Sequence, residues 1–182
     1  GYPGYNGVIP FENGFISEML AAQGYNTYMV GKWHLSPSVT ETAAGPYDRW
    51  PLARGFERFY GFLGGETNQW APFLYDGTAV VELPNDPNYH FMTDMTEKAR
   101  AWIKYIADAK QVAPEKPFYL QLCFGATHAP HHVPKEWADR YSGMFDGGWD
   151  AYRETVFARQ KELGVIAPDA PLSRHDPDVP DW

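Results

Sequence analysis

Two stretches of this sequence share one pattern, an amphipathic helix followed by an apolar strand, and this pattern restricts the fold more than any other feature. Residues 15–23 (FISEMLAAQ) have the apolar spacing of a short helix, and residues 25–30 then have the composition of a strand. Residues 94–108 are the clearest helix, and residues 118–124 (FYLQLCF) form a strand apolar enough for burial on both faces. Helix–strand units of this kind build a mainly parallel sheet flanked by helices, so we predict an α/β fold.

Each predicted helix has polar residues near its start that are suited to capping. The candidates are Asn13 or Ser17 for the first helix and Thr93 or Asp94 for the second. A side-chain oxygen at such a position accepts a hydrogen bond from one of the first backbone N–H groups, which have no partner within the helix.

Both predicted strands end in loops that carry histidine. Lys32, Trp33 and His34 follow the first strand, and His128 and His131 follow the second. The carboxyl ends of parallel strands lie at one edge of the sheet, and ligands bind outside that edge. We therefore expect Lys32, His34 and His128 to converge across one cleft.

The segment of residues 36–89 has no regular periodicity, and aromatic residues are interspersed in it with glycines. A connection of this length inside a compact domain is uncommon, and one that exists usually builds a binding cleft. The alternative is a surface excursion pinned by its aromatic side chains, without a chemical role. The sequence alone supports both interpretations equally.

Composition limits the kinds of partner. The chain has 182 residues and a formal net charge of −8. It has no basic run to neutralise phosphates and no apolar run of about 18 residues, so we expect no binding to nucleic acid and no membrane span. Cys123, the one cysteine, lies in an apolar run and is expected in the core, which leaves no disulfide and no thiolate metal site. The length suits one domain, and residues 135–141 and 149–163 have the pattern of surface helices.

A lysine and two imidazoles at strand ends, in an acidic protein, suit the binding of a small tetrahedral oxyanion. Lysine supplies a point charge, and histidine supplies a donor that also moves a proton near neutral pH. The alternative is that His34 and His128 only satisfy backbone carbonyl groups where the loops start. A zinc site of His128, His131 and His132 is less consistent with the sequence, because Pro130 prevents helical spacing and no carboxylate lies directly beside the cluster.

Three segments resemble motifs of the sulfatase family. Residues 24–35 (GYNTYMVGKWHL) match the signature G-Y-x-T-x-x-x-G-K-W-H, which is specific. Residues 54–62 (RGFERFYGF) resemble the family's R-G-F-D-x-F-Y-G-F, and residues 127–131 (THAPH) resemble its T-H-x-P-H. The order and spacing of these motifs agree across nearly the whole chain, most closely with large bacterial arylsulfatases.

The resemblance implies an alkaline-phosphatase-like α/β fold, here only partial, and hydrolysis of small sulfate monoesters to an alcohol and sulfate. In that family, a formylglycine made from Cys or Ser forms a gem-diol; one hydroxyl attacks sulfur, and the other later collapses to expel sulfate. By resemblance, Lys32 contacts the sulfate and the diol, while His34 orients the diol and acts as a base. His128 would bind a sulfate oxygen and help to protonate the leaving alcohol, and His131 would line the substrate pocket. Such enzymes are often periplasmic or secreted.

The departures from the family pattern are equally informative. The nucleophile motif C/S-x-P/A-x-R is absent, and Cys123 lacks the proline and arginine that it requires. The acidic pairs that would hold Ca²⁺ and a second active-site lysine are also absent. We therefore expect residues 1–182 to be an internal part of a sulfatase catalytic domain, truncated at both ends, with the Ca²⁺ ligands and the formylglycine elsewhere. Two alternatives are a non-catalytic oxyanion-binding or interaction protein and a phosphate or phosphonate monoester hydrolase.

Overall fold

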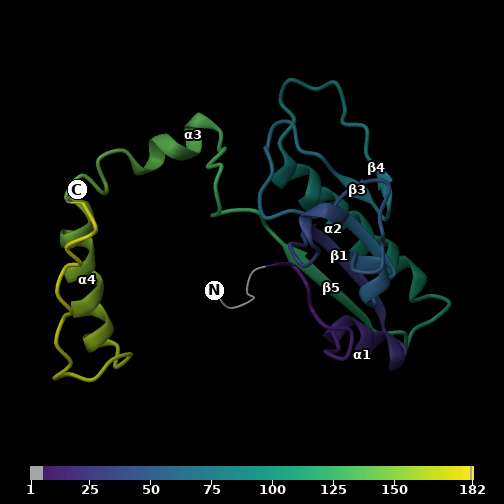
Figure 1. The fold of residues 1–182 in the computed structure, drawn as a ribbon, viewed down its shortest axis with the longest axis horizontal. Helices are drawn as coiled ribbons and strands as arrows, with labels where there is room; N and C mark the ends of the chain where they lie inside the picture. Colours follow the sequence, from purple (N-terminus) through teal and green to yellow (C-terminus); the bar gives the residue numbers. More distant parts are fainter. Residues whose placement is uncertain (1–5, 181) are drawn as a thin grey trace. The chain divides into compact units, whose positions relative to one another are not determined.

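The computed structural model describes residues 6–180 and residue 182 of the chain. The chain divides into two compact units, and the boundary lies between His132 and Val133. The first unit contains the sheet, whereas the second contains only helices and irregular segments among its described residues (Figure 1). The sequence shows no composition change that predicts a boundary at this point.

The central sheet of the first unit has the strand order β4-β3-β2-β1-β5. Its strands are β1 (Asn26–Lys32), β2 (Arg58–Phe62), β3 (Tyr75–Asp76), β4 (Ala79–Val80) and β5 (Phe118–Cys123). Strand β1 pairs in parallel with both β2 and β5, while β3 and β4 extend the sheet in antiparallel pairs. This mixed, mainly parallel sheet confirms the predicted α/β class.

Strand β2 lies inside the segment of residues 36–89, which has no periodicity in sequence. The strand reads RFYGF, and four of its five residues are buried, so it lacks the alternation of a strand with one exposed face. The segment also contains the short 3₁₀ helices η1 (Ser38–Thr40) and η2 (Pro51–Arg54). Part of the expected irregular connection is therefore an internal element of the sheet.

Both faces of the sheet are covered by apolar side chains. The long helix α2 (Phe91–Ala109) packs on one face, where a buried cluster includes Tyr28, Val30, Tyr60, Phe62, Phe91, Met95 and Trp102. The other face holds a largely aromatic cluster of Met29, Trp33, Trp50, Phe56, Phe59, Leu63 and Tyr75. Full burial of one such side chain stabilises the fold by roughly 1.5–3 kcal/mol.

The observed helix caps differ from the expected ones. Helix α2 is capped by His90, whose Nδ1 accepts a hydrogen bond from the Met92 N–H at 3.3 Å. Asp94 instead accepts hydrogen bonds from the hydroxyl groups of Tyr60 and Tyr89. The prediction of Thr93 or Asp94 as the cap is therefore wrong, because the helix begins three residues earlier, at Phe91.

The short helix α1 (Ile16–Ala22) has Phe15 at its N-cap, and the Phe15 N–H donates to Glu18 at 2.8 Å. Ser17 is fully buried and donates instead to the backbone oxygen of Arg54 at 2.6 Å. The prediction of Asn13 or Ser17 as the cap is wrong, because tertiary contacts recruit the Ser17 hydroxyl and Phe15 takes the cap position.

Strand β5 lies at the edge of the sheet, with β1 as its one partner strand among the described residues. Phe118 and Leu122 are exposed, and the other residues of β5 are half-buried, so the prediction of burial on both faces is wrong. Cys123 is half-buried and packs against the aromatic cluster, and its sulfur lies 3.3 Å from the Gln121 amide nitrogen.

The second unit contains α3 (Lys135–Ala138), the 3₁₀ turn η3 (Asp139–Tyr141) and α4 (Gly148–Glu162). These elements agree with the surface helices predicted at residues 135–141 and 149–163. Most of their side chains are exposed, and Trp149 packs edge-on against Trp182 with ring centroids 4.7 Å apart. None of the helices that the structure describes has the length and apolar character needed to cross a bilayer.

Candidate oxyanion-binding site

The signature segment leaves the core at the end of β1, and glycine is required where it does so. Gly31 has φ +111°, and a Cβ atom there would lie 1.9 Å from the backbone oxygen of Cys123 on β5. A Cβ atom at Gly61 of β2 would likewise lie 1.9 Å from the Gly31 oxygen. The two glycines allow β5, β1 and β2 to approach closely just before Lys32.

Trp33 anchors the turn that follows β1. Its side chain is 4% exposed and packs between Phe15, with centroids 5.6 Å apart, and Phe56, with centroids 6.1 Å apart. Its indole Nε1–H faces the Ser36 hydroxyl and the Arg49 backbone oxygen, each at 3.0 Å. The indole between the lysine and the histidine is therefore a structural residue that fixes the positions of both neighbours.

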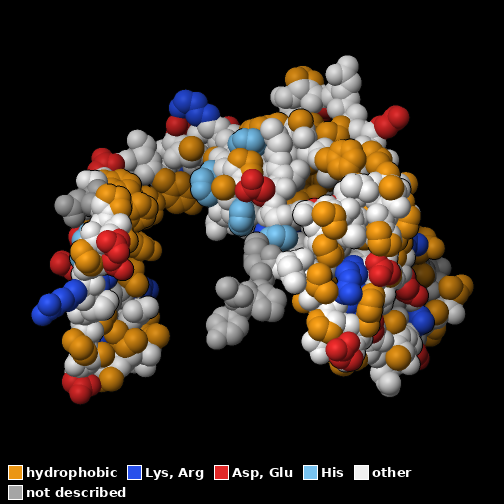
Figure 2. Space-filling model, in the orientation of Figure 1, with side chains coloured by type: hydrophobic (Ala, Val, Ile, Leu, Met, Phe, Trp, Pro, Cys, Tyr) orange, Lys and Arg blue, Asp and Glu red, His pale blue; other side chains and the backbone are white. Residues whose placement is uncertain are grey.

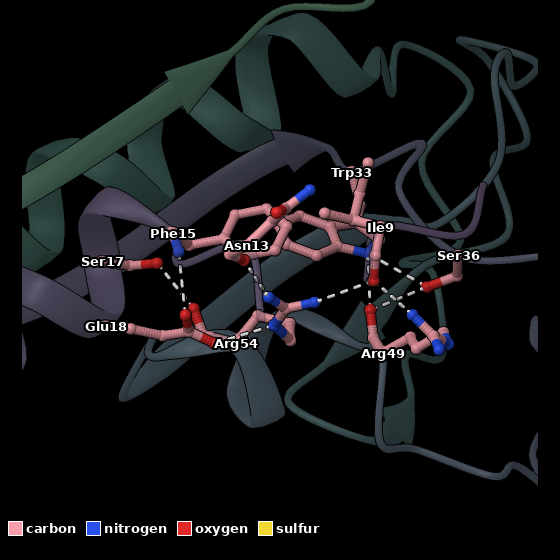
Figure 3. A network of polar contacts seen from close by, with 9 residues as sticks. All are labelled: Ile9, Asn13, Phe15, Ser17, Glu18, Trp33, Ser36, Arg49 and Arg54. Atoms are coloured by element: carbon pink, nitrogen blue, oxygen red, sulfur yellow. Dashed lines mark hydrogen bonds and ion pairs between the residues drawn. The ribbon is translucent and has the colours of Figure 1, made fainter. Parts of the chain in front are cut away.

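A buried arginine holds the surroundings of this turn together (Figure 3). Arg54 is 2% exposed, pairs with Glu18 at 2.7 Å and donates to the Asn13 backbone oxygen at 2.9 Å. Its guanidinium also lies 4.0 Å from the centroid of the Phe15 ring, which stacks on Trp33. Arg54 thus stabilises the turn after β1 through its contact with Phe15, which packs on Trp33.

His34 is held by the loop that follows β2. Its N–H donates to the Leu63 oxygen at 2.8 Å, and its φ of 53° lies in the left-handed region. Its ring lies directly against Gly65, where an added Cβ would be 2.8 Å from the ring carbon Cε1. The exits of the neighbouring parallel strands β1 and β2 therefore fix both the backbone and the ring of His34.

His128 lies on the loop after β5, on the other side of β1. Its Nδ1 is 2.8 Å from the Ala129 backbone oxygen and 3.5 Å from a carboxylate oxygen of Glu66, which belongs to the loop after β2. The His128 side chain is 48% exposed and that of Glu66 is 59% exposed. The residues that follow three adjacent parallel strands thus meet at one edge of the sheet, as the strand pattern predicts.

The loop after β5 is tied down by two histidines outside the predicted set. The His132 ring accepts a hydrogen bond from the Gln69 N–H at 3.3 Å, and the His90 Nε2 lies 3.1 Å from the His132 backbone oxygen. Because the His90 Nδ1 accepts the Met92 N–H, the His90 proton is on Nε2, and this atom donates to His132. His90 therefore caps α2 and holds the histidine loop at the same time.

The charges of the predicted residues act on one another. Burial lowers the pKa of His34 below its usual 6.5, and the positive charges of Lys32 and His128 lower it further. His34 is therefore mainly neutral at neutral pH and able to accept a proton. In Figure 2, histidine side chains gather with an acidic side chain among them, near the loop that follows β5 in Figure 1.

Of the four predicted site residues, His34 and His128 thus meet at the Gly65–Glu66 loop, and the positive charge of Lys32 acts on His34. His131 is exposed on the same loop as His128. Among the described residues, no hydrogen bond or ion pair joins it to the other three. Sequence reasoning missed Glu66, because its loop follows a strand that the pattern does not reveal. A G-G-E sequence directly after the apolar run that ends at Leu63 was the available signal.

A cavity of about 300 Å³ opens beside His34. It is lined by polar and small residues, namely Asn6, Gly7, Ser36, Ser38, Glu41, Gly64 and Gly65. Burial raises the pKa of Glu41 above its ordinary value of 4.5. The segment of residues 36–89 therefore contributes to a cavity beside the signature histidine, which favours the binding-cleft interpretation over a surface excursion.

The residues that the structure describes do not by themselves make a metal centre. Among residues 6–180 and 182, no group of three or more His, Cys, Asp or Glu side chains is placed to hold a metal ion. Calcium requires six to eight oxygen ligands, as a rule. The described residues therefore do not fit a calcium site.

Comparisons with known proteins establish the family of the chain. A sequence profile described as Sulfatase matches residues 2–175. The arylsulfatase of Klebsiella aerogenes is 31% identical over 86% of this chain and 33% of its own length, and human arylsulfatase A is 42% identical over 90% of this chain and 35% of its own length. The chain belongs to the sulfatase family, and it spans about a third of the length of these relatives.

A solved structure supports the fold. The crystal structure of Ps i-CgsB in complex with k-i-k-neocarrahexaose superposes with a TM-score of 0.58 at 24% identity, covering 88% of this chain and 37% of that protein. At this identity the similarity concerns the fold. It agrees with the α/β, sulfatase-type layered sheet of which this chain forms a part.

Proposed function

We propose that this chain supplies the oxyanion-holding part of a sulfatase active site, and that the whole protein hydrolyses sulfate monoesters to an alcohol and sulfate. The supporting observation is the meeting of Lys32, His34 and His128 at the exits of the adjacent parallel strands β1 and β5. A lysine ammonium there suits the binding of a tetrahedral anion, and two imidazoles can transfer protons to and from the reacting groups.

Each side chain has a distinct task in this proposal. Lys32 neutralises the charge of the bound sulfate group, and its position at the end of β1 is fixed by the buried Trp33 beside it. Neutral His34 orients the attacking group and acts as a base in the later step that expels sulfate, consistent with its lowered pKa. His128 donates a proton to the leaving alcohol, while His131 lines the approach of the ester.

The nucleophile and the metal belong to other parts of the whole protein in this proposal. Cys123 is half-buried beside Gln121 within the sequence LCFGA, so its sulfur is not placed as a nucleophile. The family resemblance calls for a formylglycine and Ca²⁺. The formylglycine and the ligands of Ca²⁺ would both lie outside residues 1–182. We accordingly interpret residues 1–182 as an internal part of one catalytic domain.

The family match favours sulfate over the two alternatives. Relatives across the comparison carry sulfatase names, including N-acetylgalactosamine-6-sulfatase of Canis lupus familiaris at 27% identity over 71% of this chain. A non-catalytic oxyanion-binding protein would lack the nucleophile motif altogether. Reading the complete open reading frame for an upstream C/S-x-P/A-x-R motif distinguishes these cases.

The decisive experiment measures turnover of an aryl sulfate by the full-length protein and by its Lys32→Ala and His128→Ala variants. We expect each variant to lose at least about a hundredfold in kcat, because each removes a group that stabilises charge developing in the transition state. Lys104→Ala is the matched control, since that side chain is 79% exposed on α2. Unchanged turnover in the two site variants, with the fold intact, would contradict the site.

A further inference from the structure

Glu66 places a carboxylate beside the histidine proposed as the proton donor. Its Oε2 lies 3.5 Å from the Nδ1 of His128, and both side chains are about half exposed. Glu66 follows β2, whereas His128 follows β5, and β1 lies between these two strands. The contact therefore joins the loops after β2 and β5, which are 62 residues apart in sequence.

The orientation of the His128 ring gives its two nitrogens different tasks. Nδ1 lies 2.8 Å from the Ala129 backbone oxygen. Because a carbonyl oxygen only accepts hydrogen bonds, the single proton of the neutral ring is on Nδ1. Nε2, on the other side of the ring, is then the atom that takes up and releases the second proton. When it does so, the ring becomes a cation whose Nδ1 side faces Glu66.

Lys32 and His128 both lie close enough to His34 for their positive charges to lower its pKa. Among the described residues, Glu66 provides the carboxylate within ion-pair distance of His128. A carboxylate at this separation attracts a cationic imidazole.

We propose that Glu66 is a positioning residue that keeps His128 in its doubly protonated form, ready to donate to the leaving alcohol. This inference rests on the proposed sulfatase function. As the ester S–O bond breaks, its electron pair goes to the alcohol oxygen, which takes the Nε2 proton of His128. In the net reaction, water supplies the oxygen that the attacking hydroxyl adds to sulfur, and it also supplies the proton that restores His128. Glu66 itself touches no reacting atom.

The test uses the dependence of rate on the leaving group in the full-length protein. Glu66→Gln removes the charge with little change in shape, and Glu66→Asp retains it. We expect Glu66→Gln to lower kcat about tenfold for an alkyl sulfate, whose alcohol must be protonated, and by less than about twofold for 4-nitrophenyl sulfate. Glu66→Asp should restore most of the lost rate. Equal losses on both esters would overturn the proposal, since a purely structural role would affect both alike.

A second measurement separates this inference from the proposed function. NMR of the ¹⁵N-labelled histidines reports directly how much of His128 carries both ring protons. At a pH where the wild-type ring is half protonated, we expect a smaller doubly protonated fraction in Glu66→Gln and no change in Glu97→Gln, whose carboxylate is also 59% exposed. An unchanged fraction would refute the role of Glu66 even if the protein hydrolyses no sulfate ester.

Discussion

The exits of β1 and β5 are neighbours at one edge of the sheet, yet they are built differently. The β1 exit is embedded, since Trp33 is 4% exposed and consecutive N–H groups of Trp33 and His34 donate to backbone oxygens of the β2 exit. The β5 exit lies on the surface, and His128 is 48% exposed. Its loop is held from one end by the contacts of His132 with Gln69 and His90.

This difference separates two requirements of the proposed chemistry. The groups that hold the oxyanion and accept a proton come from a rigid turn, which needs no reorganisation when the ester binds. The proposed proton donor comes from a loop with fewer restraints, so its placement depends on individual side chains. Substitutions behind the β1 exit should therefore affect folding, and substitutions around the β5 exit should affect mainly catalysis.

The largest expected effect is at Arg54, behind the β1 exit. Arg54→Ala leaves the Glu18 carboxylate and the Asn13 oxygen without their buried partner, so we expect the free energy of unfolding to fall by about 3 kcal/mol. Urea unfolding measures this. Arg100→Ala, which breaks the exposed pair with Glu97, is the control and should change stability by less than about 0.5 kcal/mol. Similar small losses in the free energy of unfolding of both variants would show that the network in Figure 3 does not stabilise the turn after β1.

Gly65→Ala should disturb the β1 exit without unfolding it. The new Cβ would lie 2.8 Å from Cε1 of His34, and the ring can move aside, so the cost in stability is small while the ring leaves its position. We expect kcat for an aryl sulfate to fall roughly a hundredfold, as displaced catalytic groups typically cause. Gly147→Ala, whose Cβ would make an ordinary 3.4 Å contact, is the control. Full activity in Gly65→Ala would exclude a role for the observed ring position.

Two substitutions at His90 separate its capping function from its hold on the β5 exit. His90→Ala removes both the cap of α2 and the hydrogen bond to the His132 oxygen, so we expect a loss of about 1 kcal/mol in stability. Asparagine still caps a helix but does not reach His132, so His90→Asn should keep most of the stability. Both variants should lose a similar several-fold factor in kcat on an alkyl sulfate. If His90→Asn retained full activity, the tie to His132 would have no part in placing His128.

The smallest expected effect concerns pH. Because the folded-state pKa of His34 lies below 6.5, the unfolded chain binds a proton at this residue more readily than the folded chain does. The contribution of this residue to stability should therefore decline as the pH falls below 6.5. Urea unfolding on either side of that pH measures it. His34→Gln should remove this part of the pH dependence, and a profile identical to that of the parent protein would contradict the assignment; His131→Gln is the control.

The acid-labile part of the stability has a different source. The hydrogen bond to Arg54 lowers the pKa of Glu18, against an opposing effect of burial, so the pair stabilises the fold fully above pH 4.5 and loses its contribution as the pH falls below that value. The His34 effect begins at higher pH, and the two are therefore separable in one titration.

The sequence by itself determined the helix–strand units and the segments that leave the sheet. Apolar periodicity located α1, β1, α2 and β5 to within a few residues, and it placed Lys32, His34 and His128 at or just beyond strand ends. This is possible because helix and strand formation follow short-range patterns, and because parallel strands share the direction of their ends.

Only the tertiary structure decided which strands are neighbours, and with them the partners of each site residue. Strand β2 carries no alternating pattern because it is buried on both faces, so the sequence did not show that Glu66 would meet His128 or that Gly65 would support the His34 ring. The cap of α2 by His90 and the buried pair of Arg54 with Glu18 likewise join distant segments. Contacts of this kind depend on the order and register of the strands, which are set by the packing of the whole sheet rather than by any local run of residues.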